Sequence, residues 1–442
     1  MNMNASDSTY ARYGSILAGT PFENDRAAAY IPYGTDVFVL ASPHAVGRGV
    51  TAPNRIAYQP MEGQDGTTDG TPTALSFDRY RALAAGGAGI VWVEATAICP
   101  EGRSNPYQYL LKEENADTFA RLCEEIKKAA LAARRPEPVV ILQLTHSGRY
   151  AKPAGTPSPL TAYHNPVLDA DSPKPVVSDD YLDTLPVLYA HSAALAERCG
   201  FDGVDLKCCH GYLLSELMSA TDREGKYGGS FENRSRLLRD AAAAVDAALS
   251  AKTVRACRLN VFDGYGDPHS FCEAPDGSVD LTEAHQTVSM LEAHGVSLLN
   301  VTMGSPYRNP DVSRPYRRGL DMPKTNAVHA LSRLLEGAKE IKEAHPSLAV
   351  VDTGISALGS LSPYAAAGLV EEGMTDFAGF GRMSFAYPSL AADILDGRFD
   401  EKKACVCCGG CSTLKKNVRK SGCIIRNPFY REEYKQFKAS EQ

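Results

Sequence analysis

The sequence has no hydrophobic run long enough to cross a membrane. The nearest candidate, Gly86–Ile98, is interrupted by Glu94, whereas a transmembrane helix needs about 20 predominantly apolar residues. An excess of positive charge is also missing. The chain has 46 Lys and Arg against 53 Asp and Glu, a formal net charge of −7, which argues against nucleic acid as the main partner. The N-terminus carries Asp7, Arg12 and Glu23 without an apolar core, so no signal peptide is expected.

The overall composition is typical of a large globular protein. Hydrophobic residues make up 44% and charged residues 22% of the 442 positions. Five of the 12 cysteines fall between Cys405 and Cys423. Clustered cysteines in an intracellular chain bind metal more often than they form a disulfide framework.

Short apolar segments alternate with helical patterns eight times along the chain. The expected strands are Asn54–Met61, Gly89–Ile98, Val139–His146, Gly203–Lys207, Val254–Phe262, Leu298–Met303, Ala349–Gly354 and Phe377–Gly381. Eight such units favour a closed α/β (β/α)8 barrel over an open sheet. A bare barrel has roughly 250 residues, so the chain also has room for appendages. We expect an N-terminal arm over 1–35, the barrel over 36–398 and a cysteine-rich segment over 399–442.

The stretch Gly200–Arg234 carries the densest reactive chemistry. Within six residues after its apolar strand stand Lys207, Cys208, Cys209, His210 and Tyr212. Barrel enzymes place their active sites at the C-terminal ends of strands, so this stretch predicts an active site. The two thiols are interpreted as packing residues. Other roles remain open: an ion pair of Lys207 with an acid such as Glu94, a core histidine, and a packing tyrosine.

Two long loops follow other strands. Thr145–Val177 holds six prolines, and Gly304–Pro323 carries four arginines, Arg308, Arg314, Arg317 and Arg318. Long loops without secondary structure are often lids or binding loops. The arginines indicate either a solvated surface or a site for an anionic or carbonyl-rich substrate.

Six sequence motifs, in order and with matching spacing, resemble the old yellow enzyme family of flavin-dependent ene-reductases. They are NRIAYQPM from Asn54, VEATAICPEGR from Val93, LQLTHSGRY from Leu142, FDGVDLKCCHGYL from Phe201 with YGGSFENR from Tyr227, TGI from Thr353, and GFGR from Gly379. The similar branch is the iron–sulfur one that includes 2,4-dienoyl-CoA reductase and trimethylamine dehydrogenase. The resemblance spans about residues 38–428.

The resemblance implies that the barrel binds FMN. The implied cofactor-binding residues are Pro60, Met61, Glu62, Ala95, Gln143, Arg258, Thr353, Gly354, Gly381 and Arg382. Gln143 can both donate and accept hydrogen bonds at the flavin pyrimidine edge, and Arg258 can stabilise reduced flavin. Gly354, Gly381 and Arg382 stand where barrels bind phosphate. A structural ion pair for Arg258 and two tight turns for the glycines are the alternative interpretations.

The resemblance also implies the substrate side of the site. Lys207 and His210 occupy the positions that hold a substrate carbonyl in the family, and Tyr212 matches the proton donor. Tyr307 and Arg308 are expected to contact substrate as well. Lys207 departs from the commoner histidine. Glu62 also departs, because relatives have Cys, Thr or His there. A carboxylate near flavin would lower its reduction potential, unless it is protonated or swings away.

The cysteine cluster matches a known ligand spacing. Cys405, Cys408, Cys411 and Cys423 form C-x2-C-x2-C-x11-C, which suits a [4Fe–4S] cluster and resembles the family's iron–sulfur branch. Cys407 makes the register ambiguous, and a structural zinc site is the alternative. No G-x-G-x-x-G follows the cluster. Electrons are therefore expected either directly from NAD(P)H or from a separate electron-donating protein.

The resulting hypothesis is an FMN- and [4Fe–4S]-containing ene-reductase of an anaerobic cytoplasm, acting on an enone- or enoate-type substrate. An oxidative amine dehydrogenase is a second possibility, although Lys207 and the arginine-rich loop argue against an aromatic cage for a cationic amine. A non-redox barrel lyase with zinc is a third, and an electron-transfer or scaffold subunit that has lost turnover is a fourth. The oligomeric state stays open.

Overall fold

A computed structural model describes residues 16–23, 25–316 and 323–441. The first 15 residues of the expected arm, and Arg317 and Arg318 of the arginine-rich loop, lie outside the described residues. Residues that follow the gap at position 24 form a 3-10 helix, Arg26–Tyr30. The arm's Leu17, Ala28 and Ile31 are buried in the main hydrophobic core.

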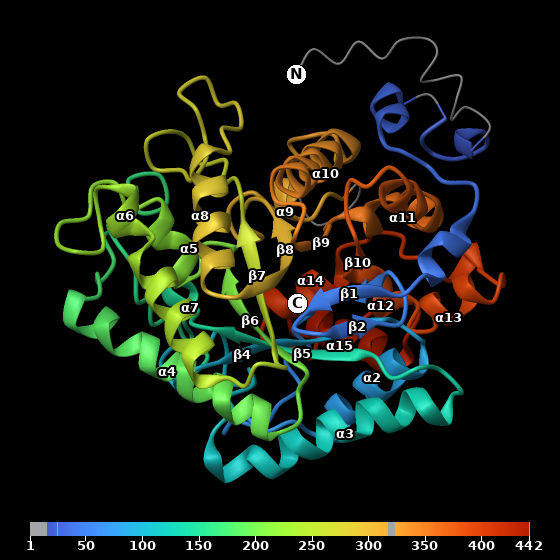
Figure 1. Ribbon diagram of the computed structural model, residues 1–442, viewed down its shortest axis with the longest axis horizontal. Helices are drawn as coiled ribbons and strands as arrows, with labels where there is room; N and C mark the ends of the chain where they lie inside the picture. Colours follow the sequence, from blue (N-terminus) through green and yellow to red (C-terminus); the bar gives the residue numbers. More distant parts are fainter. Residues whose placement is uncertain (1–15, 24, 317–322, 442) are drawn as a thin grey trace.

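Eight parallel strands form the predicted barrel (Figure 1). They are β3 (Ile56–Tyr58), β4 (Ile90–Ala97), β5 (Val139–Thr145), β6 (Gly203–Cys208), β7 (Val254–Asn260), β8 (Val296–Thr302), β9 (Ala349–Val351) and β10 (Ala378–Phe380). Their order in the sheet runs from β10 through β3 to β9. A parallel bridge between Val351 and Phe377 joins the two edges. The ring is therefore closed, and the carboxyl ends of all eight strands meet at one mouth.

Helices surround the strands as the apolar periodicity predicts. The principal ones are α2 (Ala74–Ala85), α3 (Ala116–Ala132), α4 (Asp179–Arg198), α7 (Arg236–Ala248), α8 (Thr282–Ala293), α10 (Ala327–Ala344), α11 (Ser362–Glu371) and α13 (Leu390–Leu395). In α3 the buried side chains Phe119, Leu122, Cys123 and Ile126 recur at helical spacing, which places one apolar stripe against the barrel. The helical stretch between β6 and β7 that packs on the barrel is interrupted at Ser235, which separates α6 (Phe231–Arg234) from α7. No described helix has the length and apolarity needed to span a membrane.

An antiparallel hairpin that the sequence pattern did not reveal covers the N-terminal end of the barrel. Its strands are β1 (His44–Gly47) and β2 (Val50–Ala52). The buried side chains of Val46 and Ala52 join Trp92 and Ile141 in a separate core cluster inside the ring. The hairpin thus seals one end of the barrel and leaves the other for chemistry.

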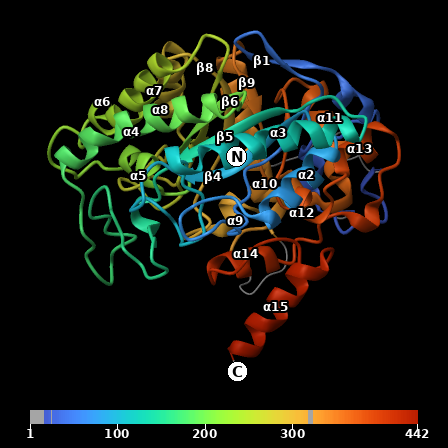
Figure 2. The same cartoon turned by 90° about the horizontal axis from the view of Figure 1, so that it is seen from below.

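The opposite end carries the cysteine-rich segment. Its helices α14 (Gly410–Lys416) and α15 (Pro428–Ser440) lie beyond the end of the barrel, and α15 projects away from it (Figure 2). Short helices also follow the strands at this end: α5 (Leu213–Met218), α9 (Pro310–Ser313) and α12 (Arg382–Ala386). The backbone N–H of Ser421 donates to the carbonyl of Gly63 at 2.7 Å, so the segment is hydrogen-bonded directly to the loop after β3.

Candidate active site

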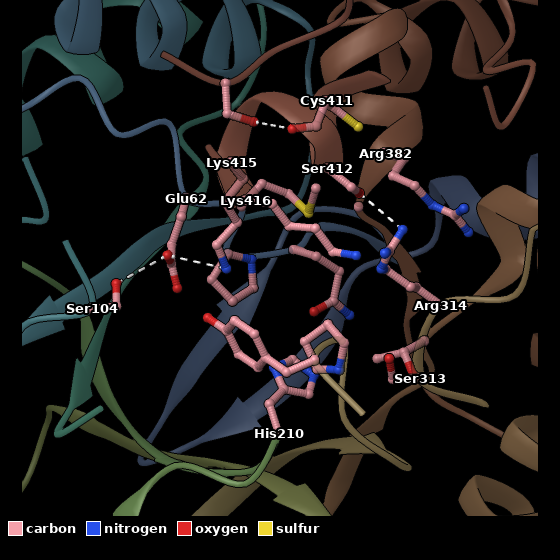
Figure 3. A pocket seen from close by; sticks show the side chains of 18 of the residues that line it. Glu62, Ser104, His210, Ser313, Arg314, Arg382, Cys411, Ser412, Lys415 and Lys416 are labelled. Carbon is pink, nitrogen blue, oxygen red and sulfur yellow. Dashed lines mark hydrogen bonds and ion pairs between the residues drawn. The ribbon is translucent and has the colours of Figure 1, made fainter. Parts of the chain in front are cut away.

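A cavity of about 430 Å³ opens at the C-terminal mouth of the barrel. It brings together residues that follow different strands (Figure 3). Eleven of the residues expected to contact the flavin or the substrate line it: Pro60, Met61, Glu62, Lys207, His210, Arg258, Tyr307, Thr353, Gly354, Gly381 and Arg382. The assembly follows from the fold, because parallel strands present their carboxyl ends at one edge.

Four other candidate residues lie outside the cavity lining. Gln143 is buried in β5, where its Nε2 donates to Asp205 Oδ2 at 2.6 Å. Ala95 is buried in β4, and its carbonyl accepts from Gln108 at 3.1 Å. Tyr212 is buried and reaches the site through its hydroxyl, as described below. Arg308 is exposed.

Glu62 is the centre of the polar network in the cavity. Its Oε1 lies 3.3 Å from Lys207 Nζ and accepts from the Tyr212 hydroxyl at 3.3 Å. Its Oε2 lies 3.1 Å from Lys415 Nζ and accepts from Ser104 Oγ at 3.4 Å. Burial opposes ionisation, but Lys415 and Lys207 outweigh it and lower the pKa of Glu62 to about 2. The carboxylate is therefore charged, contrary to the protonated alternative.

Lys207 is ion-paired to an acid, but not to the one suggested by the sequence. Its partner is Glu62, and both side chains are almost completely buried, at 4% and 5% exposed. Glu94 instead pairs with Arg79 and accepts from the backbone N–H of Gly63 at 2.9 Å. Burial raises the pKa of Glu94 to about 7 despite the attraction of Arg79. Glu94 therefore stabilises the loop after β3 and is not part of the cavity lining.

Three tyrosines form an aromatic group beside Lys207. Tyr150 stacks on Tyr307 with ring centres 3.8 Å apart, and the hydroxyls of Tyr212 and Tyr307 are 3.0 Å apart. Lys207 Nζ lies 3.9 Å from the centre of the Tyr212 ring, a distance typical of a cation–π contact. Burial, followed by the Glu62 carboxylate, raises the pKa of Tyr212 well above its usual value. The phenol is therefore protonated at neutral pH.

His210 reaches the cavity from a strained backbone. Its φ is +65°, a conformation uncommon for residues other than glycine, and its carbonyl accepts from Ser305 Oγ at 3.1 Å. Burial, assisted by the charges of Arg258 and Lys207, lowers the pKa of His210 well below 6.5. The imidazole is thus neutral and can offer a directed hydrogen bond rather than a charge.

The cavity also has unsatisfied donors that could hold an anionic group. Arg258 Nε and Arg382 Nη1 are buried without a hydrogen-bond partner among the described residues, whereas Arg382 Nη2 donates to the carbonyl of Pro315 at 2.7 Å. Gly354 has φ +99°, a region open to glycine at little cost. Buried unsatisfied donors are rare in native structures, so these groups fit a phosphate and a polar ring edge, such as those of FMN.

The five clustered cysteines line a second, small cavity next to the first. Arg382 and Cys411 line both cavities. The Cys407 thiol is buried and donates to the carbonyl of Ser356 at 3.2 Å. In the described ranges, no group of three or more His, Cys, Asp or Glu side chains is arranged to hold a metal ion.

Sequence reasoning missed several lining residues. Lys415 and Lys416 of α14 reach the cavity, as do Ser104 and Tyr150. Arg314, known from the sequence only as a loop arginine, donates to Ser412 Oγ of α14 at 2.9 Å. The lysine pair between Cys411 and Cys423 was the available signal, but the distance along the chain between these lysines and the barrel strands concealed their contact with the cavity.

Comparison with known proteins supports a flavin enzyme. The model of the NADH:flavin oxidoreductase / NADH oxidase family matches residues 40–401. An NADPH dehydrogenase of Bacillus pumilus is 31% identical over 274 residues, which cover 60% of this chain and 73% of that relative.

Two solved structures share the fold. One, a 2-naphthoyl-CoA reductase with 2-naphthoyl-CoA, has a TM-score of 0.73 at 22% identity, over 90% of this chain and 58% of the other. Histamine dehydrogenase from Rhizobium sp. 4-9 has a TM-score of 0.68 at 21% identity, over 90% of this chain and 53% of the other. The chain thus spans a little over half the length of both. With the barrel, the cavity at its mouth and the family match over most of its length, this chain belongs to the NADH:flavin oxidoreductase / NADH oxidase family of oxidoreductases.

Proposed function

We propose that this protein is an FMN-dependent ene-reductase that reduces a C=C bond conjugated to a carbonyl or carboxyl group. The observation that carries the proposal is the grouping of an ammonium, a neutral imidazole and a protonated phenol at one side of the cavity. These three groups, Lys207, His210 and Tyr212, are what the addition of a hydride and a proton across such a bond requires.

The cavity residues fit FMN as the source of hydride. Arg382 and Gly354 would hold its phosphate, and Arg258 would place positive charge at the polar edge of the ring, because these groups present unsatisfied donors or open backbone there. Pro60 and Met61 would supply an apolar wall. When bound and reduced, FMN supplies a hydride to the substrate. Reducing equivalents would come from NAD(P)H or from a separate electron-donating protein.

The polar residues would act on the substrate. Lys207 and His210 would draw negative charge onto the conjugated oxygen as hydride reaches the β-carbon. Tyr212 would then give its proton to the α-carbon. The phenol is a credible acid because the Lys207 ammonium, 3.9 Å from its ring centre, would stabilise the phenolate left behind.

We propose further that the cysteine-lined cavity holds a [4Fe–4S] cluster on Cys405, Cys408, Cys411 and Cys423. The ligand spacing supports this, and so does the single cavity that the thiols share. Because Cys407 is directed to the Ser356 carbonyl, Cys408 is the better ligand. Arg382 and Cys411 line both cavities, so a cluster and a flavin held there would be close enough for electrons to pass between them.

Amine oxidation is less well supported. The three tyrosines could form an aromatic cage, but Lys207 Nζ lies over Tyr212 at 3.9 Å and Lys415 Nζ lies 5.7 Å from the centre of Tyr307. Two aromatic faces therefore already contact the chain's own ammonium groups. A cationic amine would be repelled from this side of the cavity.

Anaerobic stopped-flow spectroscopy tests the proposal. Reduced protein is mixed with a panel of enones and unsaturated carboxylates, and the reappearance of oxidised flavin absorbance gives the rate. Tyr212→Phe should slow reoxidation by about 10²-fold or more, while Tyr107→Phe, an exposed tyrosine, should not. A wild-type protein that no activated alkene reoxidises would overturn the proposal.

A further inference from the structure

The Glu62 carboxylate lies in a ready-made anion site. Four donors from four parts of the chain converge on its two oxygens: the ammonium groups of Lys207 and Lys415, the hydroxyl of Tyr212 and the hydroxyl of Ser104. Figure 3 shows Glu62 between Ser104 and Lys415. Such convergence of charged and neutral donors is how proteins bind carboxylates.

The site holds more positive charge than its own carboxylate can balance. Glu62 is the single acidic side chain in the described lining of the cavity. Apart from Arg258 and Arg382, which are assigned to FMN, the lysines and arginines of that lining are Lys152, Lys207, Arg314, Lys415 and Lys416. Even the inner group of Lys207, Lys415 and Glu62 keeps one excess positive charge. An excess charge that is largely removed from water is costly unless a counter-ion offsets it.

Lys415 does not belong to the barrel. It comes from α14, in the cysteine-rich segment, and reaches Glu62 with its side chain 29% exposed. Arg314 is held to the same helix through Ser412 Oγ at 2.9 Å. The cysteine-rich segment therefore contributes a cation to the barrel mouth, beyond any part that it has in electron transfer.

We infer that Lys207 and Lys415 form a carboxylate-binding site, and that the substrate is an α,β-unsaturated carboxylate rather than a neutral enone. The inference rests on the proposed function and names the substrate class for the same cavity. Glu62 occupies this site when no substrate is present, and the substrate carboxylate replaces it or binds beside it. Lys415 is the residue that selects the charge.

The negative charge of an unsaturated carboxylate explains why its reduction needs two ammonium groups. A carboxylate is a poor activating group, because the negative charge that develops during hydride addition at the β-carbon falls on oxygens that are already anionic. Two ammonium groups would offset both charges. The β-carbon would receive the hydride that FMN supplies when bound and reduced, the C=C π bond would break, and Tyr212 would deliver the proton to the α-carbon. The product is the saturated carboxylate.

Ligand binding to the oxidised FMN-loaded protein tests the inference without turnover. The probes are trans-cinnamate and its neutral amide, and each dissociation constant is measured from the flavin difference spectrum. Cinnamate should bind at least tenfold more tightly than cinnamamide. Lys415→Gln should remove at least tenfold of the cinnamate affinity and leave the amide unchanged. Lys420→Gln, an exposed lysine of the same segment, is the matched control.

A second variant is expected to raise the affinity for cinnamate rather than lower it. Glu62→Gln removes the competing carboxylate and keeps the shape of the side chain, so it should tighten cinnamate binding. Equal affinity for acid and amide, or equal losses of both in Lys415→Gln, would overturn the inference.

Reoxidation of the reduced flavin by enones and by cinnamate distinguishes a failure of this inference from a failure of the proposed function. If neutral enones reoxidise the reduced protein while cinnamate neither binds nor reacts, ene-reduction stands and the carboxylate site fails. If cinnamate binds through Lys415 but no alkene is reduced, the carboxylate site stands and ene-reduction fails.

Discussion

Replacing Glu62 by glutamine should destabilise the protein by about 3 kcal/mol. The two lysines lower the pKa of the buried carboxyl from 4.5 to about 2, which corresponds to about 3 kcal/mol of stabilisation of the charged form. Removing one partner from a buried ion pair typically costs about 3–5 kcal/mol, which agrees. For a chain of 442 residues, this lowers the melting temperature by about 3 °C.

The effect should depend on pH in a direction set by the lowered pKa. Because the folded-state pKa of Glu62 lies below the unfolded value, its stabilisation is fully present above about pH 4.5 and is lost as the pH falls towards 2. The difference in unfolding free energy between wild type and Glu62→Gln should therefore be largest at pH 7 and smaller at pH 3.5.

Urea denaturation followed by circular dichroism, at pH 7 and at pH 3.5, measures this difference. Glu224→Gln, at an exposed glutamate, serves as the control and should change stability by less than about 0.5 kcal/mol. A Glu62→Gln protein as stable as wild type at pH 7, or a loss that does not change with pH, would refute the ion-paired carboxylate.

Three further changes have distinct expected outcomes. Arg258→Gln removes a charge-assisted contact of about 1.5–3 kcal/mol, so equilibrium dialysis should show FMN binding weakened roughly ten- to hundredfold; unchanged binding would place the cofactor elsewhere. Cys408→Ser should lose most of the iron measured after anaerobic purification, whereas Cys407→Ser should keep it, and the reverse result would exchange their roles. Burial raises the pKa of Asp352 to about 7, so its ionisation opposes folding as the pH rises. Asp352→Asn should therefore stabilise the protein by about 1–4 kcal/mol at pH 8, with a smaller gain at pH 4; thermal unfolding at both values checks this.

The barrel was predictable because its signal is local. Each strand is a short apolar segment and each main helix has its own periodicity, so the eight units can be recognised one at a time. The hairpin β1–β2 could not be found this way. Its strands have four and three residues, and its role depends on Val46 and Ala52 meeting strand residues far along the chain.

The candidate site was predictable only where a residue follows its own strand. Lys207, His210 and Arg258 could be placed from their position in the alternation and from the family motifs. Their partners could not, because strand geometry decides them. Glu94 is directed towards Arg79, so that Glu62 becomes the partner of Lys207. Lys415 comes from a segment that no barrel pattern connects to the cavity.

The most direct test of the proposed chemistry is a single-turnover product analysis. Anaerobically reduced protein is mixed with excess cinnamate or a neutral enone, and the saturated product is quantified by mass spectrometry against the FMN released by acid. At least one saturated product per FMN from the preferred substrate is the expected result. Full reoxidation of the flavin without any saturated product, or no reoxidation by either compound, would contradict the assignment of Lys207, His210 and Tyr212 to C=C reduction.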